Sequence, residues 1–331
     1  MNNSVPSVTV LIAARPEQVE IKAVTASRAL DYPADKLEII VARGKQPSIQ
    51  RNVAIKAARG ELIYFLDDDS VPQPSNLRQA VAHFANPEVQ MVGGPNCCPP
   101  EAPQLEQVFA LVLASWLAFG PSRARYKAVG RKRETSEKEL ILCNLVARRD
   151  SLLQLGGFNE ALYPNEENAL MDELQKRGGT LIYDPEFFVY RRPRSSLKAF
   201  AKMFLTYGRG RAEQFRFHPT TGSALNFVPP LFCLYLAIVV VCWILSPLVP
   251  VLAILRKFII LPLAAYALIV LAQVALVVSG AGLLRSIATI PLIALAHVLY
   301  GLGFLRGLFT TFRPAKQRTI HAEVVLETVR L

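Results

Sequence analysis

The sequence is poor in cysteine and in acidic residues, and each shortage excludes a class of protein. Its five cysteines form no CxxC pair, and two of them, Cys233 and Cys242, lie in apolar sequence. This usage indicates neither a disulfide framework nor a zinc site, and it agrees with a domain that faces the cytosol. The first sixteen residues have neither the basic stretch nor the apolar core of a secretory signal.

Acidic residues are outnumbered by basic ones, 26 to 37, which gives the chain a formal charge of +11. The sequence contains no helix-turn-helix, zinc-finger or RNA-binding signature, so we expect no nucleic-acid partner. In a chain with long apolar segments, such a charge favours contact with anionic headgroups or phosphorylated lipids. Membrane lipids are therefore the expected partners of this excess charge.

Long stretches of the last third of the chain carry no charge. Residues 225–255 carry none, and two further uncharged stretches cover 258–279 and 286–305. A membrane-spanning helix needs about 20 apolar residues, and these stretches approach or exceed that length. We expect a span near 228–246, a kinked or interfacial piece after it, and two further spans. Helices buried inside a soluble protein are the alternative.

The number of crossings decides where the C-terminal tail lies. Three crossings would place the basic tail residues, Arg313, Lys316 and Arg318, on the side opposite the N-terminal domain. Two or four crossings would place them on the same side, as the tendency of positive charge to stay inside favours. The sequence leaves this count open.

The first two-thirds of the chain alternates short apolar runs with helical patterns. Strands are predicted at 8–14, 37–42, 61–66, 90–92 and 180–183, and helices at 23–30, 48–59 and 165–177. This alternation is typical of an α/β domain with a mainly parallel twisted sheet. Another apolar segment, 107–119, precedes a basic stretch over 122–138. It predicts either a piece lying on a membrane surface or a core helix followed by a solvated loop.

Three consecutive carboxylates, Asp67, Asp68 and Asp69, end the predicted strand at 61–66. Like charges this close repel one another unless a cation or a basic side chain neutralises them. A magnesium ion that also binds a substrate phosphate would do so, because it takes only one or two carboxylates from a protein. The carboxyl end of a strand is also where open α/β sheets bind ligands. An acidic surface turn is the alternative.

Five short motifs occur in one order along the chain. They occupy residues 8–17, 50–52 with 58–61, 65–69, 156–160 and 165–168. This order resembles glycosyltransferase family 2, the inverting nucleotide-sugar enzymes of GT-A fold, over about residues 5 to 215. Two downstream pieces, at 189–192 and 207–211, look like membrane-attached members that make bacterial exopolysaccharides or lipid-linked sugars. The resemblance implies a nucleotide-diphosphate sugar donor and a membrane-bound acceptor.

The resemblance also implies roles for individual residues. Asp69 would bind Mg²⁺ or Mn²⁺, and Asp67 would contact the ribose or the ion's water shell, where the ion stabilises the leaving diphosphate. Glu167 aligns with the general base of an inverting reaction, and Glu166 is its acidic neighbour. The residues implied in donor binding are Ala13, Ala14, Glu17, Arg51, Asp67 and Asp68. A surface salt bridge for Arg51, and a preference of acidic residues for a helix N-terminus, are the structural alternatives.

A cluster of arginines follows the predicted strand at 187–190 and continues before the first span. Its members are Arg191, Arg192, Arg194, Arg209 and Arg211. We expect the cluster to hold the phosphate of a lipid acceptor or the donor diphosphate, because guanidinium groups bind phosphate through two hydrogen bonds. Ordinary positive charge flanking a membrane span is the alternative.

The sequence departs from the family pattern at three places. The second strand ends in a basic turn, 42–48, instead of the Asp-rich turn that holds the nucleobase in the family. The sequence therefore does not identify the nucleotide of the donor. The aligned base is Glu instead of Asp. Arg191 stands where many relatives have a metal-binding histidine, and an arginine cannot ligate a cation. The Gln-x-x-Arg-Trp signature of processive synthases is absent from the sequence.

The sequence thus predicts three regions. A GT-A glycosyltransferase domain is expected over 1–222, an all-α transmembrane domain of about three spans over 223–312, and a basic tail over 313–331. The expected protein is an integral protein of the bacterial plasma membrane with a cytosolic catalytic domain. We expect it to transfer a sugar to a membrane-bound, polyprenyl-linked acceptor in cell-surface polysaccharide or glycolipid synthesis. A processive polysaccharide synthase and a non-catalytic scaffold that retains the GT-A fold are the alternatives.

Overall fold

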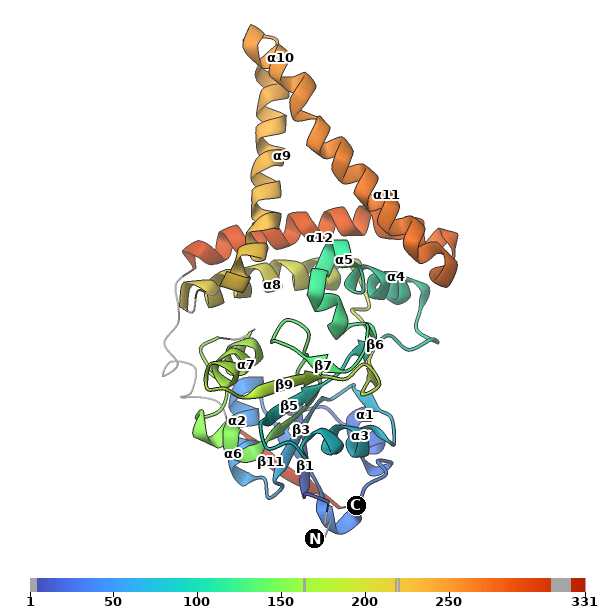
Figure 1. Ribbon diagram of the computed structural model, residues 1–331, viewed down its shortest axis with the longest axis vertical. Helices are drawn as coiled ribbons and strands as arrows, with labels where there is room; N and C mark the ends of the chain where they lie inside the picture. The colour runs from blue at the N-terminus through green and yellow to red at the C-terminus, as the bar shows by residue number, and fades with distance from the viewer. Residues whose placement is uncertain (1–4, 163–164, 218, 220, 311–322, 331) are drawn as a thin grey trace. The chain divides into compact units, whose positions relative to one another are not determined.

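A computed structural model of the protein describes residues 5–162, 165–217, 219, 221–310 and 323–330. The chain forms two compact units, which we describe separately (Figure 1). The first comprises Met1–Glu101, Pro121–Arg192 and Phe312–Leu331, and the second comprises Ala102–Gly120 and Pro193–Thr311. The expected tail residues Arg313, Lys316 and Arg318 lie outside the described residues.

The first unit is built on an eight-stranded sheet with the order β11-β2-β1-β3-β8-β5-β9-β7. The alternation of buried side chains along β1 directs Val8, Val10 and Ile12 to one face and Leu11 to the other. The strands are β1 (Val8–Ala14), β2 (Leu37–Arg43), β3 (Leu62–Asp67), β5 (Val89–Gly93), β7 (Arg133–Glu134), β8 (Asn144–Arg148), β9 (Thr180–Tyr183) and β11 (Val325–Val329).

The expected α/β fold class is confirmed, and its parallel part carries the N-terminal motifs. Strand β1 pairs in parallel with both β2 and β3, and β5 pairs in parallel with β9. Strands β7, β8 and β11 add antiparallel pairings, so the sheet as a whole is mixed. Parallel neighbours end at the same edge of a sheet, so the turns after β1, β2 and β3 lie together.

Helices cover both faces of this sheet, and each face has its own hydrophobic core. One core includes Ala23 of α1 and Leu77 of α3, whereas the other includes Ile55 of α2, Leu152 of α6 and Met171 of α7. The helices of this unit are α1 (Lys22–Arg28), η1 (Ala34–Lys36), α2 (Pro47–Ala57), α3 (Asn76–His83), α6 (Arg149–Gln154) and α7 (Glu166–Lys176). Helix η2 (Gly120–Arg125) begins with the last residue of a segment of the second unit and continues in the first.

A second, three-stranded sheet has the order β4-β10-β6. It consists of β4 (Val71–Pro72), β10 (Val189–Tyr190) and β6 (Asn96–Cys97). Strand β4 follows the aspartate run directly and pairs antiparallel with β10, so that Val71 faces Tyr190. This pairing brings the residue after Tyr190, Arg191, to the aspartates although more than 120 residues separate them in the chain.

The second unit is entirely helical. It consists of α4 (Gln104–Leu113), α5 (Trp116–Phe119), α8 (Leu197–Phe217), η3 (Thr221–Phe227), α9 (Val228–Leu245), α10 (Pro250–Ile259), α11 (Leu261–Ala281) and α12 (Leu283–Phe309). Among the residues that the structure describes, three stretches are long and apolar enough to cross a membrane: Ala224–Leu245, Pro250–Ala281 and Leu283–Phe309. The bent pair of α4 and α5 together would make a fourth.

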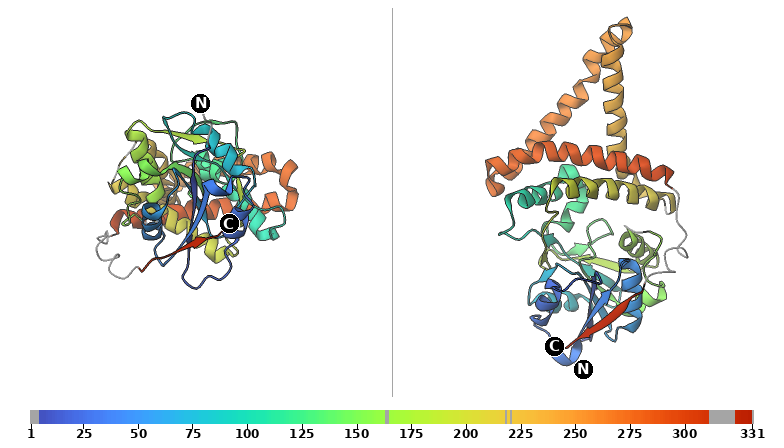
Figure 2. Two further views of the ribbon diagram at one scale, coloured as in Figure 1. Left: turned by 90° about the horizontal axis from the view of Figure 1, so that it is seen from below. Right: turned by 180° about the vertical axis from the view of Figure 1, so that it is seen from behind.

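Helix α8 lies alongside α12, and small residues let the two backbones approach closely (Figures 1 and 2). A Cβ atom added at Gly208 would lie 2.0 Å from the Tyr300 carbonyl oxygen, and one at Gly303 would lie 2.3 Å from that of Leu205. The hydropathy pattern predicts a domain limit at 222, whereas packing groups α8 with the apolar helices. Helices α9 to α11 rise as a hairpin in the same unit.

Candidate active site

The aspartate run lies at the carboxyl end of β3, beside the end of β1. Asp67 is the last residue of β3 and stands opposite Ala13 in the parallel register. Arg191, which follows β10, donates Nε to Asp69 Oδ1 at 2.5 Å and places Nη2 3.2 Å from Asp67 Oδ2. One guanidinium therefore bridges the first and third carboxylates of the run and removes most of their mutual repulsion.

A second arginine extends this arrangement to the acidic pair. Arg51 of α2 places Nη2 3.3 Å from Asp67 Oδ1 and Nη1 3.2 Å from Glu166 Oε1. The result is a row of alternating charge that runs from Asp69 through Arg191, Asp67 and Arg51 to Glu166. The structure thus brings together three predicted site motifs that lie far apart in the sequence.

Glu166 and Glu167 occupy different environments at the start of α7. Glu166 is buried, and burial, with the nearby charge of Glu167, raises its pKa from 4.5 to about 7. Arg51 opposes this rise and lowers the pKa. Glu167 is half-buried, and no hydrogen bond or ion pair engages its carboxylate within the described ranges. Glu166 is therefore held in the row of charges by Arg51, whereas Glu167 is a half-buried carboxylate beside it.

The residues on either side of Arg51 fasten the loops around the site. Gln50 donates Nε2 to the carbonyl oxygens of Ala14, at 2.8 Å, and Ala42, at 2.6 Å, which ties together the ends of β1 and β2. Asn52 accepts a hydrogen bond from the Phe158 amide at 2.7 Å and donates one to the Phe158 carbonyl at 2.9 Å. Helix α2 therefore links the motif at 50–52 to the one at 156–160.

Close packing also explains a glycine in that second motif. Gly157 has a φ of +82°, and a Cβ there would lie 2.3 Å from Asn52 Oδ1. Any side chain at this position would meet both backbone strain and the amide of Asn52. The motif is therefore a docking point for Asn52.

The donor-binding residues expected at the end of β1 lie at this same edge. Ala13 and Ala14 end the strand, and Glu17 is exposed in the loop that follows. Asp68 contributes its backbone oxygen, which accepts a hydrogen bond from the Ala23 amide at 3.1 Å. This contact ties the turn after β3 to the start of α1.

Sequence analysis missed an ion pair beside this loop. Arg43, the last residue of β2, donates Nη1 to the Gln18 carbonyl at 2.6 Å, and its Nε lies 2.6 Å from Glu327 of β11. The C-terminal strand thereby supports the loop that follows β1. No sequence signal joins the two residues, which are 284 positions apart.

The predicted arginine cluster is divided between the two units. Arg191 belongs to the charge row, and Arg192 is an exposed residue of the first unit. Arg194, Arg209 and Arg211 belong to the second unit. Within α8, Arg209 lies 3.5 Å from Glu213, and Arg211 donates to Gln214 Oε1 at 3.1 Å. Arg191 contacts both Asp67 and Asp69.

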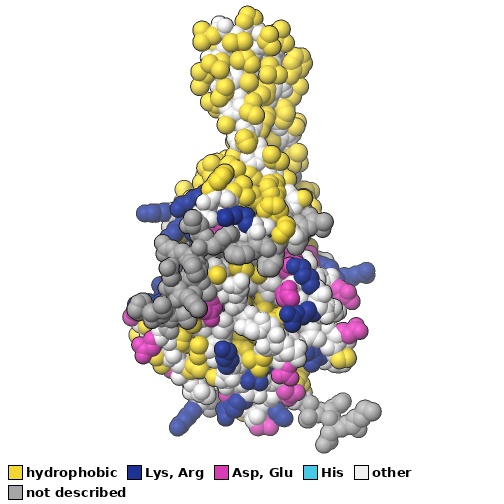
Figure 3. All heavy atoms as spheres, turned by 90° about the vertical axis from the view of Figure 1, so that its left-hand side faces the viewer, with side chains coloured by type: hydrophobic (Ala, Val, Ile, Leu, Met, Phe, Trp, Pro, Cys, Tyr) yellow, Lys and Arg dark blue, Asp and Glu magenta, His cyan; other side chains and the backbone are white. Residues whose placement is uncertain are grey.

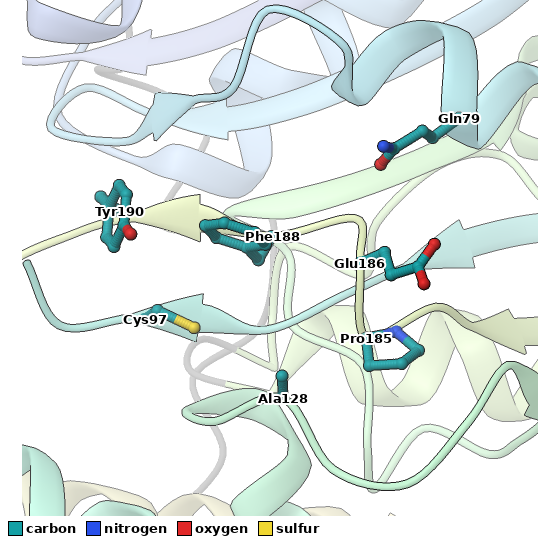
Figure 4. A pocket seen from close by; sticks show the side chains of 7 residues that line it. All are labelled: Gln79, Cys97, Ala128, Pro185, Glu186, Phe188 and Tyr190. Atoms are coloured by element: carbon teal, nitrogen blue, oxygen red, sulfur yellow. The ribbon is translucent and has the colours of Figure 1, made fainter.

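A pocket of about 470 Å³ opens on the small sheet that delivers Arg191 (Figure 4). Its walls are mainly apolar. Tyr190 of β10, Phe188 just before that strand and Cys97 of β6 line it. The remaining lining residues are Gln79, Ala128, Pro185 and Glu186. Strand β10 lines the pocket and leads directly to Arg191 of the charge row. None of the three aspartates lines the pocket.

Asp67 and Asp69 are the candidate ligands for a divalent cation. No group of three or more His, Cys, Asp or Glu side chains among the described residues is arranged to hold a metal ion. Asp67 and Asp69 provide two carboxylates, and Arg191 bridges them. Two carboxylates fit an ion such as Mg²⁺ that takes its other ligands from substrate phosphates and water. Binding such an ion requires Arg191 to release a carboxylate.

Comparison with known proteins finds similar glycosyltransferases. The curated relatives include the pre-mycofactocin glycosyltransferase of two Mycobacterium tuberculosis strains, each 24% identical over 192 residues. The alignment covers 55% of this chain but only 37% of those relatives' length. Among solved structures, a mannosyltransferase from Pyrobaculum calidifontis in complex with GDP-Man and Mn²⁺ superposes with a TM-score of 0.54. It is 16% identical, over 93% of this chain and 88% of that one.

The likeness to the mannosyltransferase concerns the fold. The profile of glycosyl transferase family group 2 matches residues 62–300, most of the chain. That range includes the aspartates at the end of β3, the acidic pair that starts α7 and all the apolar helices except the last residues of α12. The chain therefore belongs to glycosyl transferase family group 2.

Proposed function

We propose that this glycosyltransferase inverts the anomeric centre as it moves a sugar from a nucleotide-diphosphate donor to a membrane-bound acceptor. The observation that carries the proposal is the charge row from Asp69 to Glu166, at the edge where β1 and β3 end. Arginines hold its carboxylates in position at the edge where α/β sheets bind nucleotides. In the described residues the row ends beside Glu167, a carboxylate with an open side.

The reaction needs a side chain that accepts the proton of the acceptor hydroxyl. The acceptor oxygen attacks the anomeric carbon from the face opposite the diphosphate, the bond from that carbon to the diphosphate oxygen breaks, and the diphosphate leaves with the electron pair. A general base takes the proton from the acceptor hydroxyl. We assign this role to Glu167, because Glu166 is buried against Arg51 and serves to position that arginine.

The donor side rests on the aspartates. A divalent cation, Mg²⁺ or Mn²⁺, held by Asp69 and Asp67 would stabilise the charge of the leaving diphosphate. Arg191, once released from Asp69, has a guanidinium that can bind the diphosphate directly. Ala13, Ala14, Glu17 and Asp68 would line the nucleoside. The related mannosyltransferase holds GDP-Man and Mn²⁺, so GDP-sugars are the first donors to test.

The acceptor side rests on the second unit. Its apolar helices indicate an acceptor held in the bilayer, such as a polyprenyl-linked sugar or polyprenyl phosphate. Arg194, Arg209 and Arg211, which belong to this unit, would bind its phosphate at the level of the headgroups. The setting we propose is the bacterial plasma membrane, with the catalytic unit in the cytosol, in cell-surface polysaccharide or glycolipid synthesis.

Two other functions are alternatives to this transfer. A processive polysaccharide synthase needs enough helices to enclose a polymer, and the three candidate spans and one bent pair found in the described residues are few for that purpose. A non-catalytic scaffold would explain why Arg191 occupies the aspartates. The open carboxylate of Glu167 favours the enzyme, since a scaffold has no use for it.

The proposal is tested with the full chain purified in detergent, a panel of labelled nucleotide sugars and a short-chain polyprenyl-linked sugar, whose hydroxyl supplies the proton that the general base takes. We expect transfer from one donor to the lipid, with a product whose anomeric configuration, measured by NMR spectroscopy, is opposite to that of the donor. Retained configuration would contradict the inverting mechanism. Transfer to a soluble sugar but not to the lipid would contradict the acceptor assignment.

A further inference from the structure

The two ends of the helical unit return to the same sheet. The chain leaves the first unit after Arg192, passes through the helices of the second unit and re-enters the first with strand β11. Strand β11 pairs antiparallel with β2 over five residues, from Val325 opposite Arg43 to Val329 opposite Ile39. Since one sheet cannot lie on two sides of a bilayer, the chain between Arg192 and Val325 must cross it an even number of times.

Within the described part of that interval, three stretches could cross, so an even number of crossings requires that at least one of them does not. Helix α12 differs from the other two. In its most apolar 18-residue segment, α12 is 39% buried within the protein, whereas the corresponding segment of each of the other two stretches is 11% buried. The mean hydropathy of α12 is 1.9, lower than the values of 2.5 and 2.4 for the other two. A helix whose surface is already covered by protein has less to gain from contact with lipid tails.

The first turn of α12 is bound to the start of α4. Arg285 donates Nε to Gln104 Oε1 at 2.6 Å. Gln104 follows Glu101, the last residue of its segment of the first unit, by three positions, and three residues span at most about 11 Å. The start of α12 therefore lies on the same side of the bilayer as the catalytic unit.

The second half of α12 is packed against a charged helix. Arg216 of α8 donates to the Thr310 carbonyl at 2.5 Å, and the Thr310 hydroxyl donates to Glu213 at 2.9 Å. The charged residues of α8 are Lys198, Lys202, Arg209, Arg211, Glu213 and Arg216. A helix with six charges is costly in the hydrocarbon layer, and any helix that shares its length with α8 must stay outside that layer too.

Helices α9 to α11 have the opposite character. Hydrophobic side chains cover the outside of this hairpin in the space-filling view (Figure 3). At its tip, the guanidinium of Arg256 lies 5.5 Å from the ring of Trp243 and donates to Ser246 at 3.2 Å. Tryptophan and arginine are typical of the level at which a membrane helix meets the headgroups. At 1.5 Å per residue, the 22 residues of Ala224–Leu245 rise about 33 Å, enough to cross.

We propose that the protein crosses the bilayer twice, through α9 and through α10 with α11, and that α8 and α12 lie together on the surface of the leaflet that faces the catalytic unit. The partner of the α8–α12 surface is the lipid headgroup layer. The C-terminus then lies on the catalytic side, where β11 pairs with β2. This assignment does not depend on the identity of the donor or acceptor.

Single cysteines test the assignment in intact cells that make the full chain. The five native cysteines are replaced by alanine, and Leu248→Cys, Leu284→Cys, Thr328→Cys or Val19→Cys is added. These positions mark the hairpin tip, the start of α12, strand β11 and the catalytic unit, respectively. A membrane-impermeant maleimide should label Leu248→Cys in intact cells, and the other three only after permeabilisation.

Two results would overturn the assignment. Labelling of Thr328→Cys from the outside would show an odd number of crossings, and failure of Leu248→Cys to react until permeabilisation would show that the hairpin does not cross. A short epitope placed after Leu248 or after the last residue repeats the test with all native cysteines present. Antibody access to the first epitope alone in intact cells supports two crossings, and access to both contradicts them.

Discussion

Arg191 bridges Asp69 and Asp67 with one guanidinium group. Its Nε lies 2.5 Å from Asp69. Burial lowers the pKa of the guanidinium, but the two carboxylates and Cys143 outweigh burial and hold this pKa well above its usual value. We infer that the arginine stays charged at every working pH and would compete with a divalent cation for the same oxygens. This competition distinguishes the site from one in which a neutral histidine occupies that position.

Removing Arg191 should tighten the binding of a free metal ion. Arg191→Ala frees both carboxylates, so we expect Mn²⁺ to bind more strongly without nucleotide, by roughly tenfold if about 1.4 kcal/mol of competition is lifted. Isothermal titration calorimetry on the purified chain measures this directly. Arg59→Ala, which removes an arginine whose side chain is 80% exposed, is the matched control. Equal affinity in both variants and the wild type would show that Arg191 does not compete.

The acidic pair should separate into a base and a positioning residue. Glu167→Gln keeps the size of the side chain but cannot accept a proton, so we expect turnover to fall by at least ~10²-fold with donor binding retained. Glu166→Gln should chiefly change the donor's Michaelis constant, because it loosens Arg51 next to Asp67. Steady-state kinetics of the two variants decide the matter. The reverse pattern would make Glu166 the base.

The buried carboxyl of Glu166 should make stability depend on pH. Its pKa of about 7 in the folded chain exceeds its ordinary value of 4.5, so the folded state holds the proton more tightly than the unfolded state does. This contribution to stability is complete below about pH 4.5 and is lost as the pH rises through 7. Between pH 5 and 8 the Tm of the wild type should fall relative to that of Glu166→Gln. Parallel curves for the two proteins would exclude a raised pKa.

The close approach of α8 and α12 predicts that replacing Gly208 by alanine destabilises the protein and that the same replacement of Gly280 does not. Gly208→Ala places a methyl group 2.0 Å from the Tyr300 carbonyl, so the helices must separate, and we expect a loss of thermal stability in detergent. Gly280→Ala, in α11, meets no atom within 4 Å and should leave stability unchanged or raise it. Unfolding followed by circular dichroism compares them. A harmless Gly208→Ala would mean that the two helices do not pack as described.

Local sequence patterns predicted the elements but not their partners. The aspartate run identified the end of β3, because an apolar strand followed by carboxylates is a signal contained in a few residues. The contact of Arg51 with Glu166 joins residues 115 positions apart, and no single sequence carries that information. The same holds for Asn52 and the loop at Phe158, although both lie in motifs that sequence analysis singled out.

The C-terminal strand and α8 were harder to assign. Strand β11 is a five-residue edge strand that mixes apolar and polar residues, and only its pairing with β2 defines it. Helix α8 carries charges, which suggested a place in the catalytic domain, whereas its glycines pack against α12. Hydropathy counts apolar residues and cannot report which helix faces protein instead of lipid. For the same reason it could not determine the number of crossings.

The most direct test of the account is the release of nucleoside diphosphate from a panel of nucleotide sugars by the purified full chain, with Mg²⁺ or Mn²⁺ present. We expect the wild type to release it from at least one donor. Asp69→Asn should abolish the release while its unfolding transition stays unchanged, because Asp69 lies in a turn outside the core. Asp35→Asn, an exposed aspartate of η1, should behave as the wild type. Equal release by Asp69→Asn and the wild type, or none from any donor, would contradict the account.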